Sequence, residues 1–519
     1  MNDTGNTRSF FAPRWFLVTT LVILFGLGLA IRLYDLTNLP LDFHPTRQLL
    51  SALKARGMYY QTAPGVPDWQ RQMALQQWRT RAEVEPEAVE HLAAFTYQFT
   101  GEHLWVARIY SSLFWIIGGI FLFLLIRDLI SADGAVIATA YYLFFPYAII
   151  ASRAFQPDPF MVMLIIAFWW AFHFWISLTS VPSPTGRGVG VRGWLFAILA
   201  GLLGGFAIFI KFYAVFFVAG AALGELLGRY KPRDLIRNIQ LWLIVVLGAL
   251  PGAAYLFYGI VLNGFLGRQF SGRFIPSLLL SPINYVDWAV KANMAAGGAA
   301  IMLGLLGLFL VRERSVRSLL IGLWAAYILF GLYFDYHIAT HDYYQEPFIP
   351  LVALSLAPVA DWLMSRLAEM TAARWTRVAA SFVLLYGVLA TVWDVRSQLK
   401  AVDYRPQAAM WAEIGAIFDH GSGVVALTQD YGGRLAYWGW QNAIIWPNSG
   451  DIDYHDVRGA SFKFSQTFRN LTQGKHYFLV TDFAELERQP QLQQQLAGFS
   501  VYQQGDGFVI YDLTRPVTH

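Results

Sequence analysis

Acidic and basic side chains gather in a few short segments of this chain, each beside a long apolar run. The segment LDFHPTRQLL, residues 41–50, places Asp42, His44 and Arg47 just after the first of these runs. A carboxylate beside a histidine and an arginine can take a proton from a hydroxyl or an amine. Aspartate is also a favoured N-cap, so Asp42 alternatively caps a helix that starts near Pro45. The pattern predicts a general base, with a helix cap as the structural alternative.

Two further segments place single ionisable residues beside apolar runs. In SRAFQPDPF, Asp158 stands between two prolines where a helix is expected to begin, and Arg153 is near enough in sequence to pair with it. Because proline favours the first turn of a helix, Asp158 is either a catalytic carboxylate or an N-cap. Lys211 interrupts a long apolar stretch. Its ammonium group either binds a lipid phosphate or only reaches toward the membrane surface.

A third polar segment, HDYYQEPFIP, contains His341, Asp342, Tyr343 and Tyr344. These side chains either offer hydrogen bonds to a polar substrate or anchor the chain at the membrane surface. Glu85, one of several glutamates in EVEPEAVE, is a candidate to face the same site. Ionisable groups at the edge of a membrane are costly to hold there, so we expect these segments to meet at one site.

Metal and cofactor signals are weak. The chain has no cysteine and no HExxH motif, so the sequence predicts neither a thiolate site nor a zincin-type metal site. No certain cofactor is predicted. Mg²⁺ or Mn²⁺ bound by carboxylates near Asp42 is left open.

The elements that must position these residues are membrane helices. The chain has 519 residues, of which 56% are hydrophobic and 14% charged, which is more apolar surface than water-soluble cores can bury. Apolar runs long enough to cross the membrane recur along it, and the stretch 194–227 is expected to cross twice, turning near Lys211. The prediction is an all-α polytopic membrane bundle of about eleven transmembrane helices over residues 1–394.

The basic residues predict how the bundle is oriented. Short cytoplasmic loops are enriched in arginine and lysine, and every basic cluster falls on one side if the N-terminus is cytoplasmic. We therefore expect a multi-pass protein of the plasma (inner) membrane with its C-terminal part outside the cytoplasm. The net charge of +4 is explained by these loops, and no nucleic-acid partner is predicted.

Residues 395–519 have a different composition, with short strand-like runs that alternate with helical ones. GVVALTQ, NAIIW, HYFLVTD and GFVIYDL are typical of strands, while AAMWAEIGAIF and ELERQPQLQQQLA are typical of helices. DYGGRLAYWGW lacks the spaced glycines of a dinucleotide site and predicts a turn followed by an aromatic packing face. The tail is expected to be a soluble extracytoplasmic α/β domain.

Taken in order, these motifs resemble the GT-C glycosyltransferases, in particular the group of protein O-mannosyltransferases and bacterial aminoarabinose transferases. The resemblance covers Trp15 to about Trp393, and the family pattern is matched by Glu85, Pro86 and residues 101–108. It implies transfer of a sugar, with inversion, from a polyprenyl-phosphate donor to an acceptor outside the cytoplasm. The acceptor class, whether protein, lipid or polysaccharide, stays open, and membrane lipids are expected partners.

The resemblance also implies roles for single residues. The first loop of the family carries an Asp-Glu pair where this chain reads DFHPTRQ, so the role of base or acceptor orienter passes to Asp42, the carboxylate close by. Asp158 matches the acid of the second outer turn. Arg47 and Lys211 would hold the phosphate, and His341 with Tyr344 would line the pocket. The full set of expected substrate-binding residues is His44, Arg47, Glu85, Arg153, Lys211, His341, Asp342, Tyr343 and Tyr344.

Two other functions fit part of the pattern. A lipid or lipid-sugar transporter or flippase would show ionisable residues deep inside its helices. Here the charges cluster at one face, and His173 is the main interior exception, expected to donate a hydrogen bond between helices rather than to relay protons. The second alternative is a catalytically inactive relative that binds a lipid-linked sugar.

Overall fold

A computed structural model describes residues 9–11, 13–83, 85–180, 190–267, 273–370, 374–418, 420–421, 423–459 and 461–517. The chain forms two compact units. The first comprises Met1–Leu36, Glu83–Ala88 and Ala107–Ala401, and the second comprises Thr37–Ala82, Val89–Val106 and Val402–His519. Residues 33–104 are thereby divided between the two units.

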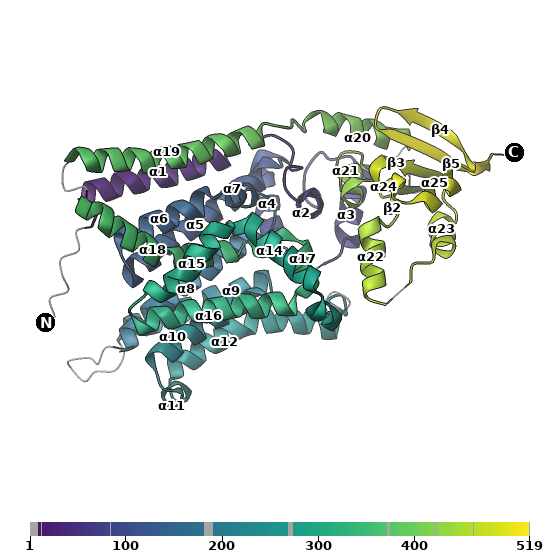
Figure 1. The fold of residues 1–519 in the computed structure, drawn as a ribbon. Helices are drawn as coiled ribbons and strands as arrows, with labels where there is room; N and C mark the ends of the chain where they lie inside the picture. Colours follow the sequence, from purple (N-terminus) through teal and green to yellow (C-terminus); the bar gives the residue numbers. More distant parts are fainter. Residues whose placement is uncertain are drawn as a thin grey trace. The chain divides into compact units, whose positions relative to one another are not determined.

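The described part of the first unit is helical (Figure 1). Its elements are α1 (Arg14–Arg32), α5 (Trp105–Leu129), α6 (Ala132–Phe144), α7 (Pro146–Ala151), α8 (Asp158–Ser180), α9 (Val191–Ile210), α10 (Ala214–Arg229), α11 (Pro232–Ile236), α12 (Ile239–Leu256), η1 (Phe257–Leu262), η2 (Pro276–Leu280), α14 (Pro282–Ala296), α15 (Gly298–Leu310), α16 (Arg314–Tyr333), α17 (Asp335–Thr340), η3 (Asp342–Gln345), α18 (Phe348–Met370) and α19 (Arg374–Leu399).

Eight helices of the described chain are long and apolar enough to cross a membrane, or nine if the bent pair α14 and α15 forms one span. The sequence predicts about eleven. The difference arises where expected runs form shorter helices. Pro146 divides one run into α6 and α7, because proline lacks the amide hydrogen that would continue the helix. The run 194–227 breaks as predicted, since α9 ends before Lys211 and α10 begins at Ala214.

Helix contacts in this unit depend on small residues where backbones approach closely. Gly220, Gly224 and Gly228 recur every four residues along α10 and face α16. A methyl group added at Gly224 would lie 2.6 Å from the carbonyl oxygen of Ser318, which is too close for any side chain. Such small-residue stripes let membrane helices gain van der Waals contact without a hydrophobic driving force. They hold α10, and with it Lys211, in a fixed position.

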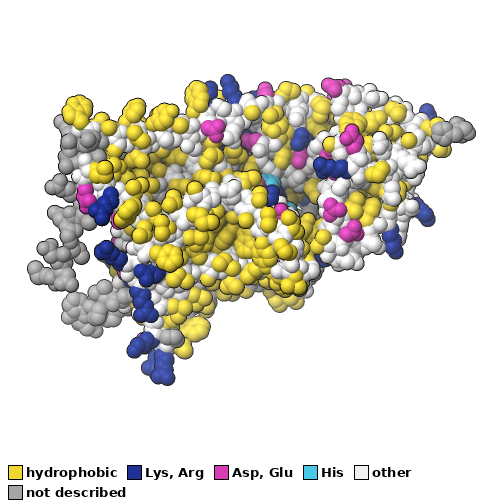
Figure 2. Space-filling view, in the orientation of Figure 1, with side chains coloured by type: hydrophobic (Ala, Val, Ile, Leu, Met, Phe, Trp, Pro, Cys, Tyr) yellow, Lys and Arg dark blue, Asp and Glu magenta, His cyan; other side chains and the backbone are white. Residues whose placement is uncertain are grey.

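Figure 2 shows apolar side chains over much of the first unit, with lysine and arginine side chains gathered at the end where α11 lies. The exposed residues of this end include Lys231, Arg233 and Arg237, next to the α10 terminus. This is the end that the sequence predicts to face the cytoplasm.

The second unit contains a five-stranded sheet with the order β2-β1-β3-β5-β4. β1 (Val424–Leu427), β2 (Ile444–Ile445) and β3 (Tyr477–Val480) are parallel, whereas β5 (Phe508–Pro516) is antiparallel to β3 and to β4 (Phe499–Gly505). The four predicted strands are confirmed. β4 was not predicted, because its residues are mostly exposed and lack an apolar pattern.

Both faces of this sheet are covered, which explains why the central strands are apolar throughout. Alternate residues of β1 enter two separate cores, with Val424 and Ala426 in one and Val425 and Leu427 in the other. The covering helices of the tail are α20 (Pro406–Ile417), η4 (Gln429–Gly432), α21 (Gly433–Tyr437), α22 (Ser449–Val457), α23 (Phe464–Thr472), α24 (Phe483–Glu487) and α25 (Pro490–Leu496).

The loop segments of the second unit form three helices, α2 (Pro45–Tyr60), α3 (Asp68–Thr80) and α4 (Ala88–Thr100). Arg56 of α2 is buried, donates to the carbonyl oxygen of Tyr437 at 2.6 Å, and lies over the rings of Tyr437 and Trp440 at 4.1 and 4.0 Å. The turn and aromatic face predicted for DYGGRLAYWGW are therefore present. Their partner is the buried arginine of α2, which the sequence did not reveal.

Candidate active site

Asp158 and Lys211 form a buried ion pair in the first unit. The ammonium group of Lys211 donates to both carboxylate oxygens of Asp158 at 2.8 Å, and the Tyr213 hydroxyl donates to the same carboxylate at 2.9 Å. The side chains of Lys211 and Asp158 are 3% and 0% exposed. A buried charge is stable only where it is paired and hydrogen bonded, so the two side chains must be held in this geometry by the elements around them.

Local backbone geometry positions both members. Asp158 is the first residue of α8 and follows Pro157, whose carbonyl oxygen accepts from the amide of Met161 at 3.0 Å. Lys211 has an extended backbone between α9 and α10, with φ −147° and ψ 118°. Its carbonyl accepts from Ala214, where α10 begins. Each charged residue therefore lies at a helix terminus rather than within a helix.

Further groups surround the Lys211 ammonium. Glu85 forms a longer ion pair with it at 3.4 Å and is 22% exposed, so this carboxylate lies toward solvent. The Tyr213 and Tyr343 rings lie 5.5 and 5.3 Å from the Lys211 nitrogen, within reach of cation–π attraction. Tyr344 stacks on Tyr213 with ring centroids 5.2 Å apart. The structure thus brings together Asp158 of the segment SRAFQPDPF (the PDP turn), Lys211, and residues 341–344 (the HDYY segment), as the sequence predicts.

Two buried polar side chains beside this ion pair have no hydrogen-bond partner among the described residues. Both carboxylate oxygens of Glu346 are unsatisfied, and so are both polar atoms of the Gln156 side chain. Glu346 is fully buried and near enough to Asp158, Lys211 and Asp342 to interact with them electrostatically. Buried polar atoms are nearly always satisfied in folded proteins, so these two side chains are candidates to bind a polar ligand.

The sequence did not single out Glu346, Gln156 or Tyr213. Glu346 was overlooked because it stands between the HDYY motif, from which Gln345 separates it, and an ordinary apolar helix, α18. An ionisable residue next to a membrane span is itself a functional signal, and that rule would have found Glu346. No sequence rule identifies Tyr213, which is recognised only by its bond to Asp158.

The neighbouring HDYY residues have defined partners. His341 lies 2.7 Å from the Thr340 hydroxyl through its Nδ1 atom, and Arg273 donates to the Tyr344 hydroxyl at 3.5 Å. Burial, together with the nearby charges of Arg273 and His341, lowers the pKa of His337 to about 3. A histidine in this state is neutral near pH 7.

Asp42, His44 and Arg47 belong to the second unit. His44, with φ 42°, holds the N-cap position of α2 and its own side chain makes no capping bond, so the residue at the N-cap is His44 rather than Asp42. Arg153 donates to the backbone oxygen of Asp35 at 3.3 Å. The ion pair that Asp158 makes is with Lys211, which is therefore not the isolated charge that the sequence suggests.

A second buried polar cluster joins α5, α8 and α10. The ring nitrogens of His173 lie 2.6 Å from Glu225 and 2.9 Å from Asp128, and Arg229 pairs with Glu225 at 3.2 Å. His173 therefore bonds between helices, as predicted. Its acidic partners were not predicted.

Metal ligands are not grouped in the described part of the chain. No set of three or more His, Cys, Asp or Glu side chains there could hold a metal ion. Involvement of Mg²⁺ or Mn²⁺ stays a prediction.

Comparisons with known proteins agree with this architecture. Residues 84–258 match the family described as dolichyl-phosphate-mannose-protein mannosyltransferase. ArnT from Cupriavidus metallidurans, solved with undecaprenyl phosphate, is 15% identical, with a TM-score of 0.56 over 96% of this chain and 98% of that one. The oligosaccharyltransferase AglB from Archaeoglobus fulgidus, solved with an inhibitory peptide and a dolichol-phosphate, is 13% identical, with a TM-score of 0.53 over 97% and 74%. A search of curated proteins found no match.

Proposed function

We propose that this chain transfers a hexose or pentose from a polyprenyl-phosphate donor to an acceptor on the extracytoplasmic side of the plasma membrane. The match of residues 84–258 to the mannosyltransferase family and the fold shared with ArnT and AglB support this proposal. The acceptor hydroxyl or amine would lose a proton and attack the anomeric carbon. The bond to phosphate would break with inversion, which releases the polyprenyl phosphate.

The observation that carries this proposal is the buried Lys211 ammonium, which is bound by Asp158, itself an acceptor for the Tyr213 hydroxyl, and lies 3.4 Å from Glu85. Lysine has three donor hydrogens, and the Glu85 contact is longer than a good hydrogen bond. A donor phosphate would replace Glu85 and keep the Asp158 bonds. The cation would then neutralise the charge that develops on the leaving phosphate.

This arrangement separates the roles of the two candidate carboxylates. Asp158 accepts from both an ammonium and a phenol, so its oxygens are poorly placed to take another proton. We assign it to positioning Lys211. We keep Asp42 as the base, on the strength of its place in the first outer loop. Glu346 and Gln156 would accept and donate hydrogen bonds to hydroxyl groups of the sugar, which would satisfy their buried polar atoms.

The first experiment identifies the lipid-linked sugar that copurifies with the full-length protein by mass spectrometry. That lipid then serves as the donor in proteoliposomes, with formation of a glycosidic bond as the readout. We expect Asp42→Asn to reduce transfer by at least 100-fold, while Asp68→Asn, at an exposed carboxylate of the same unit, leaves it unchanged. Unchanged transfer in Asp42→Asn removes Asp42 from the mechanism. Passage of the labelled lipid across the membrane without a new glycosidic bond would support a flippase instead.

A further inference from the structure

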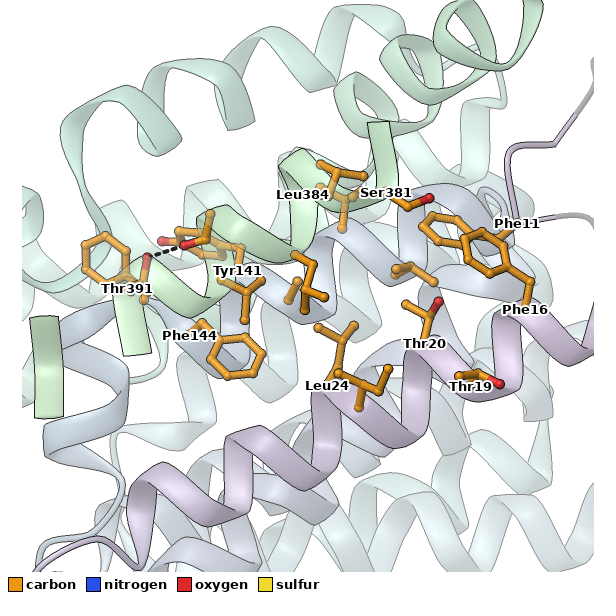
Figure 3. A pocket seen from close by; sticks show the side chains of 18 of the residues that line it. Phe11, Phe16, Thr19, Thr20, Leu24, Tyr141, Phe144, Ser381, Leu384 and Thr391 are labelled. Atoms are coloured by element: carbon orange, nitrogen blue, oxygen red, sulfur yellow. Dashed lines mark hydrogen bonds between the residues drawn. The ribbon is translucent and has the colours of Figure 1, made fainter. Parts of the chain in front are cut away.

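An apolar cavity of about 480 Å³ lies between α1, α6 and α19 of the first unit. Figure 3 shows Leu384 and Ser381 of α19 facing Leu24 and Thr20 of α1 across this space, with Phe144 of α6 beside them. Its volume is within the range of small-molecule sites, ~300–1,000 Å³. We infer that this cavity binds one acyl chain of an anionic phospholipid whose phosphate lies at Arg377.

The cavity lining has little capacity to hold water. Three of its hydroxyl groups already donate to backbone carbonyls: Thr391 to Gly387 at 3.0 Å, Ser381 to Arg377 at 2.8 Å, and Tyr141 to Ala296 at 2.6 Å. Cavities lined in this way stay dry or bind apolar ligands. Ile23 and Leu385, both lining residues, are 39% and 36% exposed, so the cavity opens toward the outside of the bundle. In a membrane, that side holds hydrocarbon chains.

The dimensions select a single lipid chain from one leaflet. The lining residues of α19 extend from Ser381 to Thr391. At ~1.5 Å per residue this span is about 15 Å, which is half of a ~30 Å hydrocarbon layer. An acyl chain that enters at one membrane surface would therefore fill the cavity and end near the bilayer centre.

A cationic side chain lies at one end of the row of α19 residues that line the cavity. Arg377 precedes Ser381 by one turn, and its guanidinium lies 5.8 Å from the Phe10 ring, next to the lining residue Phe11. Its Nε atom is buried without a hydrogen-bond partner among the described residues. The nearby Asp133 carboxylate is occupied by the amides of Phe10 and Phe11. A lipid phosphate at this position would accept from Arg377.

The position of Arg377 favours a phospholipid over the isoprenoid donor. Arg32, at the far end of α1, donates to the Ser152 hydroxyl in the turn that leads to Asp158. Arg377 contacts Phe10, just before the start of α1. The 19 residues of α1 span about 28 Å at ~1.5 Å each, so Arg377 and Asp158 lie at opposite membrane surfaces. The occupant is therefore a lipid of the leaflet opposite to the candidate active site.

The test uses two glycines of the first unit at which an added side chain meets open space. Gly387 lines the cavity, whereas Gly26 does not, and neither has an atom within 4 Å of an added Cβ. Full-length protein is titrated with phosphatidylglycerol, and bound lipid is counted by native mass spectrometry. We expect Gly387→Phe to weaken retention at least tenfold and Gly26→Phe to leave it unchanged. Equal retention by Gly387→Phe and the unaltered protein would overturn the proposal.

A second pair of variants tests the headgroup. Arg377→Gln should reduce phosphatidylglycerol retention several-fold and phosphatidylcholine retention less, because the choline ammonium of phosphatidylcholine already neutralises its phosphate. Arg366→Gln is the matched control, since Arg366 is exposed and paired with Glu369 at 3.1 Å. If Gly387→Phe does not fold, density for a chain in the cavity of the unaltered protein in phosphatidylglycerol nanodiscs decides the question. An empty cavity there, or a polyprenyl phosphate as the retained lipid, contradicts the inference. None of these readouts depends on transfer activity.

Discussion

Helix α8 carries one buried polar cluster near each end, and the two clusters differ in how completely their hydrogen bonds are made. Asp158 and His173 are about 22 Å apart along the helix at ~1.5 Å per residue. Around His173, both ring nitrogens and Glu225 have partners, and one nitrogen, Nε of Arg229, lacks one among the described residues. Around Asp158, the ion pair is complete but Glu346 and Gln156 are unsatisfied. A satisfied cluster holds helices together, while an unsatisfied one is prepared for a ligand.

Loss of the Lys211 charge is expected to have the largest effect. Lys211→Met leaves Asp158 buried without its cation, which costs about 3–5 kcal/mol of stability. We expect transfer to fall by at least 100-fold and the melting temperature to drop. The double variant Lys211→Met/Asp158→Asn should recover the melting temperature but not transfer. Recovery of transfer in the double variant would show that the cation has no role in the reaction.

Glu346→Gln separates ligand binding from stability in the same cluster. The variant replaces a buried carboxyl group that has no hydrogen-bond partner among the described residues with an amide of the same shape, so the melting temperature should stay the same or rise. Transfer should decrease about tenfold to 100-fold, because one of the oxygen atoms offered to the sugar hydroxyls is replaced by an NH₂ group. The measurements are kcat/KM for the donor and thermal unfolding. A lower melting temperature with full transfer would assign Glu346 to structure instead.

The opposite result is expected at the other end of α8. Glu225→Gln weakens the bonds to His173 and Arg229, and we expect a loss of about 1–3 kcal/mol in stability with transfer within twofold of the unaltered protein. Asp128→Asn should have a smaller effect, because the Asp128 side chain is 46% exposed. Thermal unfolding and the transfer assay measure both. A tenfold loss of transfer in Glu225→Gln would remove the distinction between the clusters.

The smallest effect concerns pH. The pKa of His337 is lowered to about 3 by burial and by Arg273 and His341, so its imidazole stays neutral between pH 5 and 8. The pH profile of transfer over this range should therefore be the same in His337→Asn as in the unaltered protein. If the pH at which transfer rises or falls differs between His337→Asn and the unaltered protein, His337 titrates during the reaction.

The sequence predicted the apolar runs, the break at Lys211 and four of the five strands well, because each depends on local patterns of hydrophobicity and on proline. It also grouped Asp158, Lys211 and the HDYY segment. It failed where the partner of a residue is distant in sequence. Arg56 under Tyr437 and Glu225 beside His173 are bonds between segments with no shared motif. Short helices such as α6 were likewise read as parts of longer runs.

What the sequence determined by itself is the kind of protein: a membrane bundle with a mixed α/β tail, and polar segments at the edge of the spans. Hydrophobicity and charge set these features residue by residue, because each segment must match the solvent that surrounds it. Which charges are neutralised was decided only by the tertiary structure. Asp158 is bound by Lys211 and Tyr213, whereas Glu346 has no hydrogen-bond partner in the part of the chain that the structure describes. Helices far apart in sequence bury these groups together, and burial makes every unmade bond costly.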